Sequence, residues 1–339
     1  MTVFSLIREN APTIRDLDLL TCDHPDRPYP PVRRFRNSAI VRAIGFFVIF
    51  LAAGFVFMSI NSAITGSFGT SETSLVPVMA QTLAAVLAYL VITMLTESRI
   101  WPLEIAPKRA LGLVKGLLLG FILVSFCVLI LAIIGVYRIE SFNPAYNPWS
   151  AMMTIGVGAA VTEEILFRGI LLRLFEESVG TWGATIISGL AFGLLHVVNP
   201  DGSWWGGFAI AIEAGLLFAA VYALTRSLWW CIGLHFAWNI TEGPIWGSIV
   251  SGTGQAGSWF TSSWHGPEIL TGGSFGLEAS VIPVILWGIL AVWMLVYTQR
   301  HAVMVAPAWS RRKLLQTSQM GQSEIVPSQT QANDDPTGN

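Results

Sequence analysis

The sequence predicts an all-α fold, a polytopic membrane bundle with about eight transmembrane helices. Only 12% of the 339 residues are charged, about half of the roughly 25% that is usual in soluble domains. Hydrophobic residues make up 53%, and the mean hydropathy is +0.61. The apolar residues form long continuous runs, which favour membrane helices over alternating strands. This composition argues against an ordinary cytosolic enzyme, because the chain has far more apolar side chain than a globular fold of this length could bury.

Eight apolar runs each approach the roughly 20 residues that a helix needs to cross the hydrocarbon core. They are Ala43–Ile60, Leu75–Leu95, Gly116–Tyr137, Met152–Leu174, Trp182–Val198, Gly206–Leu224, Leu228–Val250 and Ala279–Tyr297. They divide the chain into an Arg/Pro-rich arm (1–42), three helices (43–137), a core of helices four to seven (151–250), an outer loop (251–278), a last helix (279–297) and a polar tail (298–339).

The basic residues predict the orientation, because positive loops stay on the cytoplasmic side. With the N-terminus inside, 17 of the 19 Lys and Arg residues fall on that side. The exceptions are Arg138, which falls outside, and Arg168, which lies within a span. We therefore expect both ends of a multi-pass protein to be cytoplasmic. The arm has no signal-peptide pattern, so the first span should be retained, and the tail reads as disordered.

Composition also limits the classes of partner that the protein can be expected to bind. A formal net charge of −2 provides no general basic face for nucleic acid, so the expected surroundings are a lipid bilayer and a peptide or membrane-protein substrate. The three cysteines Cys22, Cys127 and Cys231 lie too far apart to indicate a disulfide scaffold.

Polar residues within the predicted spans concentrate in the second half of the chain. Ionisable groups at this depth are expensive and usually face a protein-lined cavity, so they mark candidate sites. The first three spans contain no acidic or basic residue, whereas later spans contain Glu163, Glu164, Arg168, His196, Glu213, His235, Asn239 and Glu242.

The spacing of these residues sorts them by helix face. Glu164 and Arg168 are four residues apart, so they stack on one face and can neutralise each other. Glu163 points about 100° away from them and is left free. His235 and Asn239 are also four apart and present two hydrogen-bonding groups to one side of their helix. In the fifth span, Phe192 lies one turn before His196 and is placed to hold its ring.

Three short motifs follow one another on separate helices: Glu163-Glu164-x-x-x-Arg168, Phe192-x-x-x-His196 and His235-x-x-x-Asn239. Together they resemble the signature of the CPBP family, which comprises type II CAAX prenyl endopeptidases and Abi-like bacteriocin-processing or immunity proteins. The resemblance covers roughly residues 151–240.

The resemblance implies an intramembrane endopeptidase that acts on a membrane-associated or lipidated peptide or protein. Glu163 matches the catalytic glutamate, and His196 matches its partner in activating water. His235 and Asn239 match the pair that stabilises the oxyanion. Glu164 and Arg168 match the remaining motif positions, for which we expect a supporting ion pair. In the prenyl endopeptidases, the site opens towards the cytoplasm.

The sequence does not decide whether the site binds a metal ion. Glu163, His196 and His235 form a ligand set that suits Zn²⁺, and members of the family are often described as metalloproteases. However, the chain has no H-E-x-x-H pair, and each ligand would come from a different helix. A metal-free Glu/His water site explains the same residues, and we favour it.

Two other functions compete with proteolysis. In a proton-coupled transporter, Glu163, His196 and Glu213 would relay protons, although the internal repeats of many transporters are missing. A non-proteolytic immunity or scaffold protein of the same family is the second alternative. Glu213 either lines the cavity or pairs with Arg168 or Arg173, and Glu242 is expected near the outer interface.

The predicted depths of the site residues disagree. At about 1.5 Å per residue, Glu163 lies about 16 Å, His196 about 21 Å and His235 about 10 Å from the cytoplasmic ends of their spans. Because helix tilt and boundary shifts of a few residues can remove such differences, we expect a polar cavity near the middle of the membrane.

Overall fold

The computed structural model describes residues 38–66, 75–97, 102–254, 256–301, 304–311 and 313. Most of the predicted arm and tail lies outside these residues. The α-helices are α3 (Ala39–Thr65), α4 (Val76–Glu97), α5 (Leu111–Ile133), α6 (Trp149–Ala151), α7 (Ala160–Glu164), α8 (Arg173–His196), α9 (Trp204–Ile210), α10 (Leu217–Thr225), α11 (Leu228–Ile240), α12 (Glu268–Thr271) and α13 (Val281–His301).

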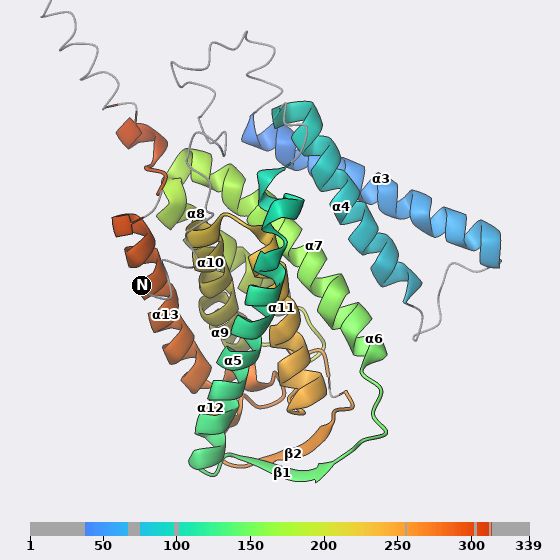
Figure 1. Ribbon diagram of the computed structural model, residues 1–339, viewed down its shortest axis with the longest axis vertical. Helices are drawn as coiled ribbons and strands as arrows, with labels where there is room; N and C mark the ends of the chain where they lie inside the picture. The colour runs from blue at the N-terminus through green and yellow to red at the C-terminus, as the bar shows by residue number, and fades with distance from the viewer. Residues whose placement is uncertain are drawn as a thin grey trace, which may run out of the picture.

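Shorter helical segments join these helices. Four are π-helical: η3 (Met152–Ala159), η4 (Ile165–Leu172), η5 (Ala211–Leu216) and η6 (Thr241–Ile245). Three are 3₁₀ turns: η1 (Leu103–Ile105), η2 (Pro107–Arg109) and η7 (Leu277–Ala279). The described chain is thus a helical membrane bundle, as predicted (Figure 1).

Five described helices are long and apolar enough to cross a membrane: Ala39–Thr65, Val76–Thr96, Pro107–Ile133, Trp204–Thr225 and Val281–His301. The predicted count of about eight spans is not confirmed. The other three predicted spans are helical but carry the polar motifs. The run predicted over Leu228–Val250 ends early, because the chain leaves the helix after η6 and turns at Gly247, whose φ is 72°.

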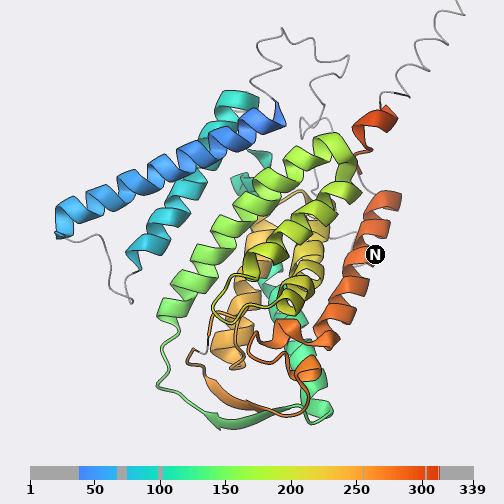
Figure 2. The same ribbon diagram turned by 180° about the vertical axis from the view of Figure 1, so that it is seen from behind.

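The fourth and fifth predicted spans form a helical hairpin that turns at Gly180 (Figure 2). The first leg runs from α6 through η3, α7 and η4 into α8, and the second leg ends at His196. Gly180 has φ 74°, and a Cβ there would lie 2.6 Å from the carbonyl oxygen of Val305. A side chain is therefore excluded at this turn. Thr181 accepts a hydrogen bond from the Val305 backbone at 2.9 Å and fixes the turn against the segment after α13.

Helix α11 packs against α5 with the two backbones in contact. A Cβ on Gly116 would lie 2.3 Å from the carbonyl oxygen of Trp230, and one on Gly233 would lie 2.2 Å from that of Leu113. Small residues at such crossings allow membrane helices to approach closely. The helix that carries His235 is thus held by a contact that depends on glycine.

A two-stranded antiparallel sheet, β1 (Tyr137–Phe142) and β2 (Phe260–Trp264), lies at one end of the bundle. The start of α3 and the end of α13 lie at the opposite end (Figure 1). The segment predicted as an outer loop (251–278) therefore contains β2 and α12. Tyr137 ties the sheet to the bundle by donating to the carbonyl oxygen of Trp246 at 3.0 Å. Burial raises the pKa of Tyr137 to about 12.

Candidate active site

Three side chains from three helices converge on one point. Oε2 of Glu163, on α7, lies 4.0 Å from Nε2 of His196 at the end of α8 and 4.0 Å from Nε2 of His235 on α11. The Glu163 side chain is 29% exposed, whereas those of His196 and His235 are 12% and 6% exposed. The three residues therefore lie together, as the sequence analysis expected.

The disagreement in predicted depth has two causes. The first hairpin leg continues past Leu174 to Gly180, so Glu163 lies about 26 Å before the turn and His196 about 24 Å after it. The turn between α10 and α11 is also buried, since Arg226 and Ser227 are almost fully enclosed. Helix α11 therefore starts inside the bundle, which brings His235 to the same level.

The orientation of His196 follows from its backbone partner. Its Nδ1 lies 2.7 Å from the carbonyl oxygen of Phe192. Because a carbonyl can only accept, Nδ1 carries the hydrogen and Nε2 is left facing Glu163. The ring centroids of Phe192 and His196 are 4.7 Å apart, so the expected contact within this motif is present.

His235 is oriented by a buried ion pair. Its Nδ1 lies 2.9 Å from Oε1 of Glu164, and Nη1 of Arg168 donates to the same oxygen at 2.9 Å. The predicted pairing of Glu164 with Arg168 is thus present, and both side chains are fully buried. Nη2 of Arg168 also donates to the carbonyl oxygens of Ala214 and Gly215, at 3.0 and 3.1 Å. The pair links the hairpin to η5 and α11, which spacing alone did not predict.

Asn239 lies one turn beyond His235 and borders the same cavity. Its Nδ2 donates to the carbonyl oxygen of Ile155 at 2.8 Å. Since an amide nitrogen carries two hydrogens, the second stays available as a donor. Asn239 therefore both fastens α11 to η3 and presents a polar group at the cavity wall.

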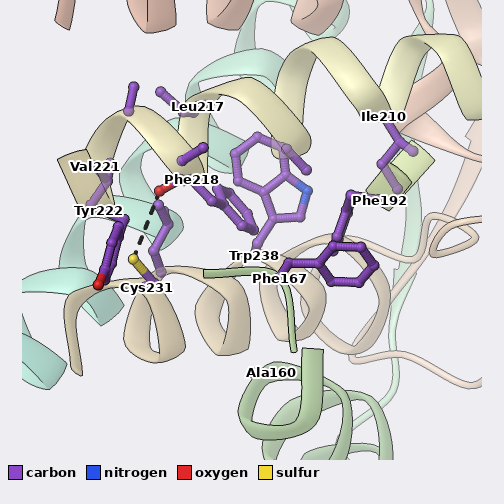
Figure 3. Packing of buried hydrophobic residues seen from close by; sticks show 14 of the residues in the cluster. Ala160, Phe167, Phe192, Ile210, Leu217, Phe218, Val221, Tyr222, Cys231 and Trp238 are labelled. Atoms are coloured by element: carbon purple, nitrogen blue, oxygen red, sulfur yellow. Dashed lines mark hydrogen bonds between the residues drawn. The ribbon is translucent and has the colours of Figure 1, made fainter. Parts of the chain in front are cut away.

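The site lies in a cavity of about 350 Å³. Five motif residues line it: Glu163, Phe192, His196, His235 and Asn239. The rest of its wall includes Gln81, Ile155, Ala159, Thr162, Leu166, Leu195, Asn199, Ile210, Ala214, Trp238, Val250, Ser251, Thr253 and Glu278. The buried rings of Phe167, Phe192 and Phe218 also line the wall. Phe167 packs edge-on against Phe192, and Phe218 packs edge-on against Trp238 (Figure 3). The Arg168 guanidinium lies 4.8 Å from the Phe192 ring centroid and 5.3 Å from that of Phe218.

Residues 145–241 match the model of a family described as Rce1-like type II CAAX prenyl endopeptidases. The matched region contains all three motifs. This region is similar to that family and is referred to below as the Rce1-like domain. The match agrees with the predicted CPBP resemblance and supports an intramembrane endopeptidase, and the five apolar helices support a multi-pass membrane protein. No curated protein and no solved structure matches the chain.

Glu278 lies outside the Rce1-like domain but reaches its cavity, and sequence reasoning missed it. Its carboxylate accepts hydrogen bonds from Nε1 of Trp238 at 3.1 Å and from the backbone N–H and hydroxyl of Ser251, each at 2.7 Å. Burial raises the pKa of Glu278, and the hydrogen bonds from Ser251 offset part of this rise. A lone acid beside the last apolar run was the only sequence signal.

Two other acids within the predicted spans do not join the site. Glu213 is fully buried, is not among the wall residues of the cavity, and has no hydrogen-bond partner within the described part of the chain. Both predicted partners bind elsewhere: Arg168 pairs with Glu164, and Nε of Arg173 lies 3.4 Å from Glu104. Glu242 lies in η6, at the end of its helix as expected, but its side chain is fully buried and accepts from Ser248 at 3.3 Å.

The donor types in the Rce1-like domain suit a zinc ion, but their spacing does not. Two ligand atoms of a tetrahedral zinc lie roughly 3.3 Å apart, whereas Glu163 is 4.0 Å from each histidine. Within the described residues, no group of three or more His, Cys, Asp or Glu side chains is arranged to hold a metal. Glu163, His196 and His235, as placed, do not fit a tetrahedral zinc ion.

Proposed function

We propose that the protein hydrolyses a peptide bond in a membrane-associated or lipidated substrate, using a water activated by Glu163 and His196. The observation that carries this proposal is the convergence of Glu163 Oε2 with two imidazole Nε2 atoms at 4.0 Å. A carboxylate beside two nitrogens in a partly enclosed polar cavity supplies the base and donors that amide hydrolysis requires.

The 4.0 Å separations are suited to a water rather than to direct hydrogen bonds. They exceed hydrogen-bond length, and a water between the groups can bond to the carboxylate and to an imidazole. In this scheme Glu163 takes a proton from the water as it attacks the carbonyl carbon. The same carboxyl then delivers the proton to the leaving amine. His196 orients the water through Nε2, since its Nδ1 is engaged with Phe192.

His235 and Asn239 are proposed to stabilise the negative charge that develops on the carbonyl oxygen. When His235 is protonated, Nε2 becomes a donor directed into the cavity, and Glu164 stabilises the positive ring from the other side. Arg168 balances the charge of Glu164. The second N–H of Asn239 is the other donor.

A proton relay through Glu213 gains no support from the described structure. Glu213 is not part of the wall that contains Glu163 and His196. A non-proteolytic role would leave unexplained why both histidine Nε2 atoms face the same carboxylate oxygen. Proteolysis accounts for each of these groups.

The proposal is tested with the purified full-length protein in detergent and a pool of internally quenched peptides. Wild type should cleave members of the pool, and Glu163→Gln or His196→Gln should reduce the rate by about 10²–10⁴-fold. Glu268→Gln makes the same chemical change at an exposed position of α12 and should leave the rate unchanged. Thermal unfolding of each variant checks its fold. Wild-type activity in either site variant would contradict the assignment, and no cleavage by wild type would contradict the proposed function.

A further inference from the structure

A second cavity of about 330 Å³ adjoins the catalytic one, and we refer to it as the outer cavity. It lies between the segment that leads from β1 into η3 and the segment that precedes β2. Its wall includes Tyr146, Asn147, Ser150, Thr154, Gly254 and Gly257. Ile155, Val250 and Thr253 belong to the walls of both cavities. The two spaces are therefore adjacent along a common wall, which Asn239 fastens through its bond to Ile155.

The chemistry of the outer cavity fits an extended uncharged peptide. Its wall residues supply hydroxyl and amide groups and several small side chains, and none of them is charged. Hydroxyl and amide groups can satisfy the N–H and C=O groups of an extended backbone. A charged side chain entering this space would lose hydration without gaining an opposite charge.

The opposite end of the bundle is filled by buried side chains, and we refer to it as the closed end. Behind the layer of Phe167, Phe192 and Phe218 lies a second buried ion pair, in which Nη1 of Arg226 is 2.6 Å from Oε2 of Glu176. Both side chains are almost fully enclosed. A polypeptide arriving from that end would have to separate buried ion pairs, which is strongly unfavourable. The wall shared with the outer cavity makes the β1–β2 end the more favourable route.

The charge distribution assigns this end to the extracytoplasmic side. Arg138 is the one Lys or Arg at the β1–β2 end within the described part of the chain. The closed end carries Lys108, Arg109, Arg300 and Arg311, as cytoplasmic ends do. This placement is opposite to the cytoplasmic mouth that the family resemblance implies.

We propose that the outer cavity is a substrate subsite that takes an extended, uncharged peptide segment from the extracytoplasmic side and leads it to Glu163. The inference rests on the proposed function for its catalytic outcome. The direction of access can be tested without cleavage. The substrate class is then a secreted or outward-facing polypeptide segment.

Cysteine accessibility tests the direction of access. Cys22 is replaced by Ser, and the buried Cys127 and Cys231 are retained. Ala159→Cys then places a thiol in the catalytic cavity wall, one helical turn from Glu163. A small, permanently charged methanethiosulfonate should modify it in right-side-out vesicles and leave it unmodified in inverted vesicles. Two controls on exposed positions mark the ends: Ile139→Cys in β1 and Lys108→Cys in η2. Modification of Ala159→Cys only in inverted vesicles, or in neither preparation, would overturn the proposal.

Filling the outer cavity tests the subsite itself. Thr154→Trp and, from a more exposed position, Ser150→Trp should each slow modification of Ala159→Cys at least tenfold. Ile139→Trp, on β1 outside both cavities, is the matched control and should leave that rate unchanged. Rates equal to the control in both filled variants would refute the subsite.

A quenched peptide that the wild type cleaves in detergent links the subsite to catalysis. Both filled variants should raise its KM, and replacing its uncharged flanking residues with Lys or Glu should do the same in wild type. Equal cleavage of charged and uncharged peptides would refute the specificity. If wild type cleaves no peptide, the proposed function fails, and the modification rates still decide the direction of access and the role of the outer cavity.

Discussion

Nδ1 of His235 lies 2.9 Å from Oε1 of Glu164, the same carboxylate oxygen that accepts a hydrogen bond from Arg168. A carboxylate in this position favours the tautomer with hydrogen on Nδ1 and stabilises the ring when it becomes positive. The second glutamate of the Glu163-Glu164 pair therefore acts on the histidine from behind, while the first faces it across the cavity.

Arg168→Lys should lower stability by about 2 kcal/mol. The guanidinium reaches Glu164 and the carbonyl oxygens of Ala214 and Gly215 at once, and a single ammonium cannot keep this arrangement. Thermal unfolding in detergent measures the loss. Arg300→Lys, at an exposed position near the end of α13, is the control and should change the unfolding temperature little. Equal unfolding temperatures for the two variants would contradict the role given to Arg168.

Asn239→Ala should lower kcat by about 10²–10³-fold with a smaller change in KM, because an oxyanion donor acts mainly in the transition state. The lost bond to Ile155 should reduce stability by about 1 kcal/mol. Steady-state kinetics with a cleaved peptide separates the two effects. Asn143→Ala, in the loop after β1, serves as the comparison. A variant with raised KM and wild-type kcat would assign Asn239 to substrate binding instead.

Glu278→Gln should reduce stability in a pH-dependent way. Burial raises the pKa of the Glu278 carboxyl, so the folded state binds this proton more tightly than the unfolded state does. The resulting stabilisation is present below the unfolded pKa and is lost as the pH rises through the folded pKa. The difference in unfolding temperature between wild type and variant should therefore shrink from acidic to neutral pH. A difference that grows over this range would contradict the shift.

Dialysis against a strong chelator should leave peptide cleavage unchanged. The reason is the 4.0 Å spacing of Glu163 from both histidines, which is wider than tetrahedral zinc ligation allows. Metal content is measured before and after dialysis, together with the cleavage rate. Loss of both a stoichiometric metal and the activity, with recovery of activity on adding that metal, would replace the metal-free scheme.

Spacing predicted the local pairs well because each pair lies on one helix. The Glu164–Arg168 pair and the Phe192–His196 contact are examples. The link from Glu164 to His235 joins residues 71 positions apart, and no helical period reports such a distance. The polar motifs still indicated that their helices meet, because an unpaired ionisable group inside a membrane is unfavourable and such groups usually pair with one another.

Helix levels and the β1–β2 end were harder to predict. The depth of His196 depends on a turn at Gly180, and that of His235 depends on a turn buried around Arg226. Hydropathy places a helix end where the apolar run stops, not where the backbone turns. Glu278 reaches the cavity only because the predicted outer loop folds back over the bundle, where β2 pairs with β1 and Ser251 binds Glu278.

The bond between Asn239 and the Ile155 carbonyl has a kinetic consequence. In the proposed scheme, Asn239 donates to the reacting carbonyl, and it also holds Ile155 in the wall between the catalytic cavity and the outer cavity. A peptide that displaces this wall would also displace the Asn239 amide, which is proposed to stabilise the transition state. Peptides that bind with similar affinity would then differ more in kcat than in KM. A poor substrate would bind, be cleaved slowly and so inhibit cleavage of a good one.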